Sequence, residues 1–565
     1  MKKKDNSILS VKDFVVKNTG MDVKTLLHDT NEYQFPALEK AAELIRKWKE
    51  EGKKFFVFAD YDVDGITSGE SMRMLLRAVG VPKNDIIVRY PKRFSEGYGM
   101  SVKAVNQFDS NGVIITVDNG VAAFEAIKAA KAKGMAVLVT DHHLASVDAS
   151  GKKMYPEADY IVDPNAIENQ AEFTAYCGCG IVFKLAARML KAGNEKALAR
   201  IRTNAAIATV ADCVPLIGEN RRIVKEGLML ATHKDIQTTG LSALLAECNL
   251  QGHVSETDVA FKIAPCLNAV GRLNDDGAAV SARLISFDGD ELSASKLAKA
   301  QVEKNEERKL LQKTWDLKAD SMIEDDGNAI ILQPEGCPEG LAGIIAGRIA
   351  DRRNRPTIIF TDNGNGILKG SGRSVEGVNL KSLLDKCQDT LVSYGGHAMA
   401  AGLKVRDLSA FKNAFNDALR ECGWTATTET EQTYDLEING SDVLTVVEEI
   451  EKYAPYGEGN PAPTFYIQNV ELIPKGSSYY SELKNEGVKL FADGYSATTF
   501  KATKKFMDEK PRRVNLFGTI ARNYFCGNSY VDVHFDDMEA VAEKNVKRTS
   551  LQKMLDEAAM RLGSI

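Results

Sequence analysis

Four clusters of acidic residues or histidines directly follow apolar segments of this chain, and their side chains are the ones best suited to chemistry. The clusters are Asp60-Tyr61-Asp62-Val63-Asp64-Gly65, Asp118-Asn119-Gly120, Asp141-His142-His143 and Asp212. Brought together, so many carboxylates would repel one another unless a cation neutralised them. The sequence therefore predicts a metal site, and the number of ligands favours two ions.

Parallel strands would bring these clusters together. The apolar runs 55–59, 113–117 and 135–140 are typical of buried parallel strands, and helical stretches separate them. In such a sheet the carboxyl ends of the strands open onto one crevice, where ligands bind. Residues two apart in an extended segment point the same way, so Asp60 and Asp62 are the nearest pair of ligands.

The acidic and histidine clusters also allow simpler interpretations. The acidic run 60–64 is compatible with a solvated turn or a calcium loop, but Thr67-Ser68-Gly69-Glu70 does not match an EF-hand. A histidine pair on a loop is more often structural, and its place after Asp141 is what makes it a ligand candidate. Mixed carboxylate and imidazole ligands suit Mn²⁺ or Mg²⁺. Two such ions about 4 Å apart would activate a water and clamp the leaving oxygen of a phosphoryl displacement.

Three basic residues near glycines are candidate phosphate holders. They occur in Asn268-Ala269-Val270-Gly271-Arg272, Gly372-Arg373-Ser374 and Gly395-Gly396-His397. Glycine lets a backbone approach an anion closely, and arginine offers the anion two donors. An ordinary turn remains the alternative for each segment taken alone.

Length and composition limit the class of protein. A chain of 565 residues exceeds the size of a single core, so we expect three or four domains. No apolar run is long enough to span a bilayer, and no signal core follows the basic N-terminus, so we expect a cytoplasmic protein. The nine cysteines include no CxxC, which predicts free thiols. The net charge of −6 argues only weakly against a nucleic-acid partner, because metal-binding carboxylates inflate the acidic count.

The pattern of elements predicts an α/β protein with an all-β domain near its end. A parallel-sheet domain with an N-terminal helical extension is expected over residues 1–285, a solvated connecting helix over 286–327 and a smaller α/β domain over 328–428. Short alternating runs between turns predict a β-barrel or sandwich over 429–545, and a C-terminal helix is expected over 546–565.

One segment of the all-β domain combines basic and aromatic residues. The cations are Lys501, Lys504, Lys505, Lys510, Arg512 and Arg513, and the nearby aromatics are Phe500, Phe506, Tyr524 and Phe525. A basic groove with aromatic platforms is one way in which β-barrels bind single strands. A solvated loop beside core aromatics accounts for the same residues equally well.

Taken together, these motifs resemble those of the DHH phosphoesterase superfamily and, more narrowly, of RecJ, a family of bacterial 5′→3′ exonucleases specific for single-stranded DNA. The resemblance follows the family order and covers residues 37–540. Besides the four clusters, the segments similar to RecJ are Arg93 with Gly97-Tyr98-Gly99, and 268–272, 305–309, 395–402 and 455–461.

The resemblance implies a role for each candidate residue. Two ions, Mn²⁺ or Mg²⁺, would be held by Asp60, Asp62, Asp118, His142 and Asp212. His143 would bind metal or the scissile phosphate, Asp141 would orient a histidine ligand, and Asp64 would belong to the catalytic group. The DNA backbone or the 5′-terminal phosphate would be held by Arg93, Asn268, Arg272, Arg373, Ser374, Gly396 and His397. The all-β domain would be an OB fold with a nucleic-acid groove at Lys501, Lys504, Lys505, Arg512 and Arg513.

The resemblance also implies a function and partners. The function would be hydrolysis of phosphodiester bonds of single-stranded DNA from the 5′ end, with release of nucleotides, in DNA repair and recombination. Single-stranded DNA would be the partner of a monomeric protein that needs no membrane, and a helicase or a single-strand-binding protein is left open as a further partner. Which metal is used and whether RNA is cut are also left open.

One segment departs from the family, and two other functions compete. Pro338 stands where RecJ proteins commonly carry the histidine of a Trp-His-x-Gly segment. A DHH enzyme for short oligonucleotides or cyclic dinucleotides is one alternative, but it would need no strand-binding barrel. A scaffold without activity is the other, but such relatives lose metal ligands and this chain keeps every expected one.

Overall fold

The chain folds into two units, which we describe separately. The computed structural model describes residues 2–29, 31–97, 99–148, 150–324, 328–362, 364, 366–425, 433–483, 486–525 and 528–541. The larger unit comprises Asp29–Thr430 with Gly457–Gly459, and the β-rich unit comprises Met1–His28, Glu431–Tyr456 and Asn460–Ile565. A search of the described helices for a long apolar one that could cross a membrane finds none.

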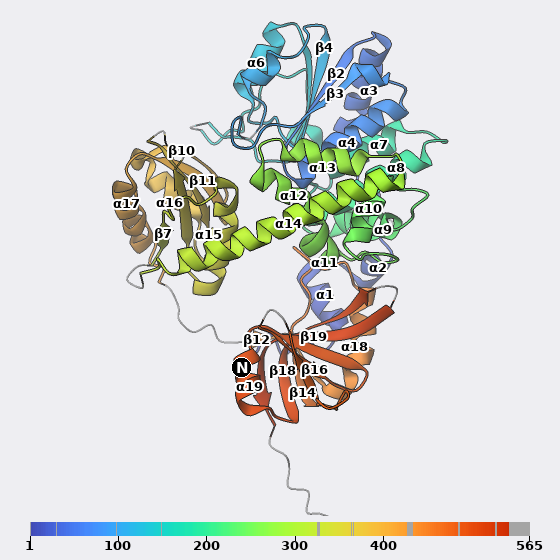
Figure 1. The fold of residues 1–565 in the computed structure, drawn as a ribbon. Helices are drawn as coiled ribbons and strands as arrows, with labels where there is room; N and C mark the ends of the chain where they lie inside the picture. The colour runs from blue at the N-terminus through green and yellow to red at the C-terminus, as the bar shows by residue number, and fades with distance from the viewer. Residues whose placement is uncertain are drawn as a thin grey trace, which may run out of the picture. The chain divides into compact units, whose positions relative to one another are not determined.

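A parallel sheet lies in the first part of the larger unit (Figure 1). Its described strands run in the order β3-β2-β4-β5-β6, and all neighbours are parallel. The strands are Lys54–Ala59 (β2), Ile86–Arg89 (β3), Gly112–Val117 (β4), Ala136–Thr140 (β5) and Tyr160–Val162 (β6). The three strands expected from the apolar runs are confirmed, and their parallel order brings their carboxyl ends to one edge of the sheet.

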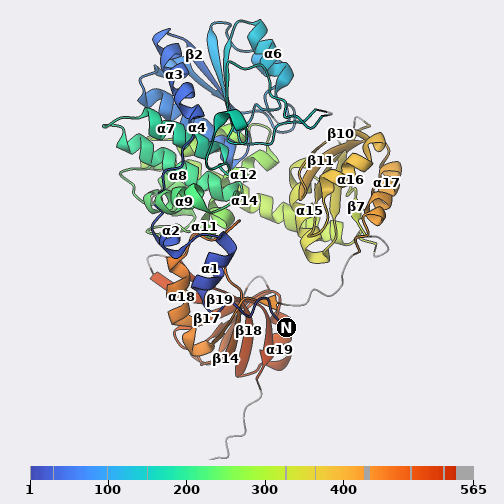
Figure 2. The same ribbon diagram turned by 180° about the vertical axis from the view of Figure 1, so that it is seen from behind.

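Both faces of this sheet are buried, which explains why its central strands are apolar throughout rather than alternating. Phe55 and Val57 face one hydrophobic core, whereas Phe56 and Phe58 face another. The first face is covered by α3 (Ala37–Glu50), α4 (Val63–Ala78) and α7 (Gly178–Met189), and the second by α5 (Val102–Val105) and α6 (Phe124–Ala132). Figure 2 shows α3 and α6 on opposite sides of β2, as Figure 1 does.

A helical layer completes this part of the larger unit. It contains α8 (Glu195–Ala211), α9 (Gly218–Ala231), α10 (Thr239–Glu247), α11 (Glu256–Asp258), α12 (Ala264–Leu273) and α13 (Gly277–Ser286). One turn of π-helix, Val259–Ile263, precedes α12. These helices pack around a core of their own, to which Val63 and Ile66 of α4 also contribute.

Helix α14 (Glu291–Asp320) leads from this part to the next (Figure 1). The sequence led us to expect a solvated helix, but one face of α14 is both polar and buried. Gln301 Nε2 donates to the carbonyl oxygen of Cys266 in α12 (3.0 Å). Arg308 donates to Asn305 and to Gln312, each at 2.6 Å. The hydrogen bond from Gln301 ties α14 to α12, whereas those from Arg308 lie within α14. No apolar periodicity could have indicated this buried polar face.

A smaller α/β part follows α14, as the sequence predicted. The order of its described strands is β10-β11-β9-β8-β7, and only β7 and β8 pair in parallel. The strands are Ile330–Leu332 (β7), Thr357–Asp362 (β8), Leu368–Arg373 (β9), Leu391–Gly396 (β10) and Ala400–Val405 (β11). The helices are Glu339–Arg353 (α15), Leu380–Lys386 (α16) and Leu408–Glu421 (α17).

The β-rich unit contains the expected all-β domain. Its described strands form one sheet in the order β13-β14-β18-β19-β17-β16-β15. The strands are Leu436–Asn439 (β13), Phe465–Glu471 (β14), Tyr480–Glu482 (β15), Val488–Phe491 (β16), Tyr495–Thr499 (β17), Arg513–Phe525 (β18) and Asn528–Ala540 (β19). Two helices accompany the sheet, Val443–Lys452 (α18) and Thr503–Glu509 (α19).

The N-terminal segment belongs to the β-rich unit, which corrects our assignment of residues 1–285 to one domain. Strand β1 (Lys2–Lys3) pairs in parallel with β12 (Thr433–Tyr434). Helix α1 (Val11–Thr19) buries apolar side chains in this unit's core, and α2 (Val23–Leu27) adds Leu26 to it. An amphipathic helix needs an apolar partner, but its periodicity does not say which core supplies one. The helix expected over 546–565 lies outside the described residues.

Candidate metal centre and cleft

The ends of the strands place the predicted acidic residues around one point. Asp60 follows β2 and Asp118 follows β4, and both are buried. His142 Nε2 lies 3.1 Å from Asp118 Oδ1 and 3.6 Å from Asp212 Oδ2. It also lies 3.8 Å from Asp64 Oδ2. Side chains that are far apart in the sequence therefore meet at the edge of the sheet.

Three groups of these side chains are arranged so that each could hold a metal ion. They are Asp60 with Asp62 and Asp118, Asp64 with His142 and Asp212, and Asp118 with His142 and His143. The ligand atoms of each group lie within 4.8 Å of one another. The structure thus brings together all five residues predicted as ligands, and Asp118 and His142 occur in two groups each, as a site for two ions would require.

Asp64 makes a connection that the sequence did not indicate. Its carboxylate accepts hydrogen bonds from the backbone N–H groups of Gly178 (2.6 Å) and Cys179 (2.8 Å), at the start of α7. The partial positive charge at a helix N-terminus favours a carboxylate there. A Cβ atom on Gly178 would come 2.6 Å from Asp118 Cβ, so only glycine fits beside that residue. The first turn of α7 therefore positions two of the candidate ligands.

The electrostatics of the cluster favour a bound cation. Burial raises the pKa of Asp60 and of Asp118 well above its ordinary value, and neighbouring carboxylates raise both further. Burial together with Asp64 and Asp62 raises the pKa of Asp212 to about 8. Asp60 Oδ1 is buried and has no hydrogen-bond partner within the described part of the chain. A divalent cation would supply that partner and neutralise the carboxylates, so the donor set fits Mn²⁺ or Mg²⁺.

Asp141 holds the histidine pair in place. Its Oδ1 accepts from His143 Nδ1 (2.8 Å) and from the backbone N–H of His142 (2.8 Å), and its Oδ2 accepts from the N–H of Val121 (2.9 Å). Burial opposes the charged form of His143, but the hydrogen bond to Asp141 and the negative charges of Asp141, Asp212 and Asp60 together outweigh burial and raise the pKa of His143 to about 9. Burial lowers the pKa of His142, which suits a neutral imidazole ligand.

Three guanidinium groups near this cluster form no ion pair within the described residues. Arg93 lies over the ring of Tyr61, 4.7 Å from the ring centroid. Arg272 donates to the carbonyl oxygen of Gly340 (3.3 Å) and Arg373 to that of Gly372 (2.8 Å). Burial, with the like charges of neighbouring arginines, lowers the pKa of Arg272 to about 9. An anion would relieve this repulsion, so the three groups are suited to a phosphate.

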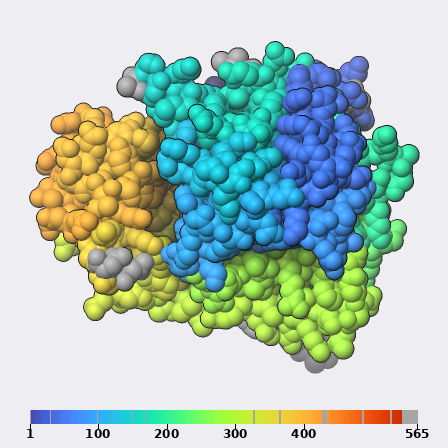
Figure 3. Space-filling model, turned by 90° about the horizontal axis from the view of Figure 1, so that it is seen from above, coloured from blue at the N-terminus to red at the C-terminus, as the bar shows by residue number. Residues whose placement is uncertain are grey.

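A cleft opens onto part of the cluster and onto Arg93. Its volume is about 1550 Å³, and residues from both parts of the larger unit line it. Asp141 and His143 line it from the metal cluster, while Gly396 and His397 line it from the smaller α/β part. Figure 3 shows a hollow between the yellow and orange segment and the cyan one.

Three segments of the chain match known protein domains. Residues 54–214 match the DHH family, N-terminal domain, residues 326–423 match the DHHA1 domain, and residues 434–537 match the RecJ OB domain. The chain is 30% identical to the single-stranded-DNA-specific exonuclease RecJ of Haemophilus influenzae, over 94% of its own length and 95% of that protein. The chain belongs to the RecJ family.

Solved RecJ structures share this fold. The structure of Thermus thermophilus RecJ in complex with Mn²⁺ superposes with a TM-score of 0.75 and 26% identity, over 94% of this chain and 76% of that chain. An exonuclease RecJ bound to manganese has a TM-score of 0.58 and 29% identity, over 68% of this chain and 95% of that chain. RecJ of Bacillus subtilis is 34% identical over 78% of this chain, which spans 55% of that longer protein.

The remaining phosphate holders expected from the RecJ resemblance differ in their suitability. The Ser374 hydroxyl donates to the carbonyl oxygen of Val378 (2.6 Å), so it stabilises a turn. Gly396 has a φ of 139°, and a Cβ atom there would come 2.4 Å from the carbonyl oxygen of Ala400, so glycine is required to shape this side of the cleft. Asn268 is half-buried on α12, one turn before Arg272.

The basic cluster predicted for the RecJ OB domain is largely neutralised. Three of its members form ion pairs, Lys501 with Asp536, Lys505 with Asp537 and Arg513 with Glu471. Arg512 lies over the ring of Tyr479, 4.2 Å from the centroid. The acidic partners come from β14 and β19, so a count of charges along 501–513 could not include them. Tyr98 and the side chain of Phe525 lie outside the described residues.

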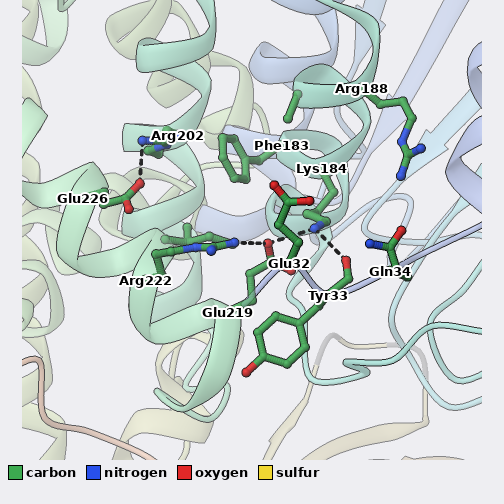
Figure 4. A pocket seen from close by; sticks show the side chains of 12 residues that line it. Glu32, Tyr33, Gln34, Phe183, Lys184, Arg188, Arg202, Glu219, Arg222 and Glu226 are labelled. Atoms are coloured by element: carbon green, nitrogen blue, oxygen red, sulfur yellow. Dashed lines mark hydrogen bonds and ion pairs between the residues drawn. The ribbon is translucent and has the colours of Figure 1, made fainter. Parts of the chain in front are cut away.

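A second cavity of the larger unit is also rich in charge, and we call it the charged pocket (Figure 4). Its volume is about 620 Å³, and α7, α8, α9 and residues 32–34 line it. The ion pairs at its wall are Lys184 and Arg222 with Glu219, Arg202 with Glu226, and Arg188 with Glu39. Its cations therefore have partners within the chain.

Proposed function

We propose that this chain is a metal-dependent exonuclease that hydrolyses phosphodiester bonds of single-stranded DNA from the 5′ end and releases nucleotides. One observation carries the proposal: a buried carboxylate and histidine cluster opens onto a cleft beside guanidinium groups that lack carboxylate partners among the described residues. The RecJ proteins of Haemophilus influenzae and Bacillus subtilis are single-stranded-DNA-specific exonucleases, which supports the substrate class.

The metal of this family is Mn²⁺ or Mg²⁺, and we assign its ligands from the geometry. The proposed ligands are Asp60, Asp62, Asp118, His142 and Asp212, and Asp64 joins them because it lies with His142 and Asp212. When bound, two divalent ions activate water as the nucleophile and stabilise the charge that develops on the leaving oxygen. The N-terminus of α7 fixes the direction of the Asp64 carboxylate, since two backbone N–H groups donate to it.

We assign His143 to the scissile phosphate. With a pKa of about 9 it carries its proton at neutral pH, and Asp141 engages Nδ1. Its Nε2–H is then the donor to a phosphate oxygen, where it offsets negative charge in the transition state. Asp141 is a positioning residue in this scheme, because it acts on the substrate only through His143.

Arg93, Arg272 and Arg373 would hold the terminal or next phosphate of the strand. Burial and the charges of Arg93 and Arg373 lower the pKa of Arg272, and burial and the charge of Arg93 lower the pKa of Arg373. Binding of an anion therefore relieves repulsion as well as forming hydrogen bonds. Gly396 and His397 would approach the strand from the opposite side of the cleft. Selection of a single strand would then follow from the width of the passage between the two parts of the larger unit.

The competing functions account for the structure less well. A pocket for a small molecule has a volume of roughly 300–1,000 Å³, and this cleft, at about 1550 Å³, is larger. A scaffold without activity would have no reason to keep a buried, mutually repelling set of carboxylates. The exonuclease is therefore the function that uses the observed features.

The cellular setting is part of the same proposal. We infer that the protein acts as a monomer in the cytoplasm, in DNA repair and recombination. A helicase or a single-strand-binding protein is the kind of partner that would supply its single-stranded substrate.

One experiment tests the proposal. Single-stranded and blunt double-stranded DNA, and RNA of the same sequence, are labelled at either end and incubated with the protein and Mn²⁺ or Mg²⁺. Release of labelled mononucleotide from the 5′-labelled single strand before the 3′-labelled one is expected. Equal rates on duplex and single strand, or first release from the 3′ label, would contradict the strand selectivity or the polarity.

A further inference from the structure

The two walls of the cleft differ in chemistry. On the side of the metal cluster the wall includes, next to Asp141 and His143, the segments 120–123 and 144–147, whose side chains are mostly apolar. On the side of the smaller α/β part the wall carries Lys369, Lys381 and Lys404. Arg93 adds a further cation, and Glu339 is the carboxylate that the smaller part contributes to the described lining. The wall beside the metal cluster therefore presents apolar surface to the cleft, and the wall of the smaller α/β part carries the three lysines.

Two side chains of the apolar wall are exposed to solvent, although a folded protein usually buries such groups. Leu144 is 63% exposed and Val147 is 59% exposed, and they follow the histidine pair directly. A bridge between Val147 and Lys153, and a hydrogen bond from the Met154 N–H to the carbonyl oxygen of Ser146 (2.7 Å), hold the segment in its shape. Exposed apolar side chains grouped in a groove mark a binding surface, because leaving them in water is unfavourable.

The cationic wall is arranged for a charged backbone. Lys404 is exposed on β11. Lys369 lies 3.1 Å from both carboxylate oxygens of Glu339, which fix its ammonium group at the cleft. Lys381 lies over the ring of Tyr394, 5.0 Å from its centroid, and forms an ion pair with Asp385. Lys404 is therefore the lysine of this wall that has no carboxylate partner among the described residues.

We propose that Leu144 and Val147 contact the bases of the bound strand, while its phosphates follow the lysine wall. This inference rests on the proposed function and specifies which part of the substrate each wall contacts. A single strand has phosphates along one edge and base faces along the other, and those faces are available to apolar side chains. In a duplex the bases are stacked inside and the phosphates lie on the outside, so the base faces cannot contact the apolar wall. Contact with exposed base faces would therefore help to select single strands.

The test compares two substrates and three variants. One substrate is a single-stranded oligodeoxynucleotide, and the other has the same length but abasic tetrahydrofuran residues near its 5′ end. Leu144→Ser/Val147→Ser removes the apolar surface, and both sites are exposed, so the fold should tolerate the change. Leu144→Met/Val147→Ile keeps the surface, and Met154→Ser changes an exposed residue of the same segment that does not line the cleft.

The expected result is a change in substrate selectivity. The unaltered protein should show a KM about tenfold higher for the abasic strand, because covering Leu144 and Val147 with bases removes apolar surface from water. In Leu144→Ser/Val147→Ser the KM for the normal strand should rise to that of the abasic strand, with kcat retained. The conservative double variant and Met154→Ser should keep the original ratio.

Two results would overturn the inference. One is an equal KM for both strands in the unaltered protein, and the other is an undiminished ratio in Leu144→Ser/Val147→Ser. Should the protein cut neither strand, the proposed function would fail, and the affinities for the same two strands, measured by fluorescence anisotropy with each variant, would decide the base-contact inference separately.

Discussion

Two cavities of the larger unit are lined with cations, and they differ in how the charge is balanced. In the charged pocket each of the four cations named above has a carboxylate partner in the chain. In the cleft, Lys369 and Lys381 are paired as well. Arg93, and Arg272 and Arg373 beside the cleft, have no carboxylate partner among the described residues. By the number of basic residues alone, the two cavities would be judged equally suited to bind an anion. The comparison teaches that unpaired charge, rather than the number of charges, marks an anion site.

The largest difference between the cavities should appear when a carboxylate is neutralised in each. Asp118→Asn removes a proposed ligand of both ions, so we expect hydrolysis in Mn²⁺ to fall by about 10³-fold or more. Glu226→Gln, beside the charged pocket, is the matched control and should leave the rate within about twofold, because an exposed ion pair contributes little. Thermal unfolding of both variants should show that each remains folded. Near-normal turnover by Asp118→Asn would remove Asp118 from the metal site.

The arginines should differ in the same way, with a smaller effect. Arg93→Gln removes an unpaired guanidinium, and a hydrogen bond to a charged group contributes about 1.5–3 kcal/mol, so we expect KM for single-stranded DNA to rise by roughly 10–100-fold with little change in kcat. Arg188→Gln, at the charged pocket, should change KM by less than about twofold. Steady-state kinetics on one oligonucleotide compares the two. A similar rise in KM for both variants would mean that pairing does not distinguish the cavities.

The metal cluster should also reveal its unbalanced charge through pH. The folded pKa of Asp212 is raised to about 8, above its unfolded value, so the folded state binds more protons and its stability falls as the pH rises toward 8. His143, with its pKa raised to about 9, acts in the same direction. Melting curves of metal-free protein should therefore shift to lower temperature with rising pH. Asp212→Asn should weaken that shift, as should saturating Mn²⁺; a melting temperature that rises with pH in metal-free protein would contradict this account.

The smallest effect is expected in the β-rich unit, where the same criterion of pairing applies. Lys504 and Arg512 form no ion pair among the described residues, whereas Lys501 and Lys505 do. If both unpaired cations contact phosphates, Lys504→Gln/Arg512→Gln should reduce the salt dependence of DNA binding by about 1.4 in the slope of log affinity against log salt. Lys501→Gln/Lys505→Gln should change the slope less. The opposite order would assign the groove to the paired lysines.

The sequence predicted the part of the molecule that local pattern determines. Buried parallel strands are apolar along their whole length, and a ligand at the end of such a strand has its place set by the sheet, so Asp60, Asp118 and His142 could be grouped in advance. Glycine beside a candidate ligand, as at Gly178, was visible in the sequence, but its closeness to Asp118 depends on how α7 packs.

The features that were missed all depend on long-range packing. The amides of α7 that bind Asp64 are more than a hundred residues away in the chain. The acidic partners of Lys501 and Lys505 lie on β19, which is the neighbour of β18 in the sheet. The N-terminal segment packs on a core formed by residues beyond 430. Neither the composition nor the periodicity of a sequence indicates which distant residues will become such partners.

Because a polar face of α14 is buried, the length of this helix determines how the smaller α/β part that follows it is oriented. Its 30 residues form a rod, and each residue turns the chain by about 100°. Gln301 and Asn305 fix the rotation of that rod against α12 and α13 through directional hydrogen bonds to Cys266 and Ser281. One residue added or removed beyond Arg308 would turn the smaller α/β part, with its lysine wall, by more than a quarter of a revolution. We therefore expect α14 to tolerate changes in length only in steps near a whole helical turn, unlike the surface loops of this unit.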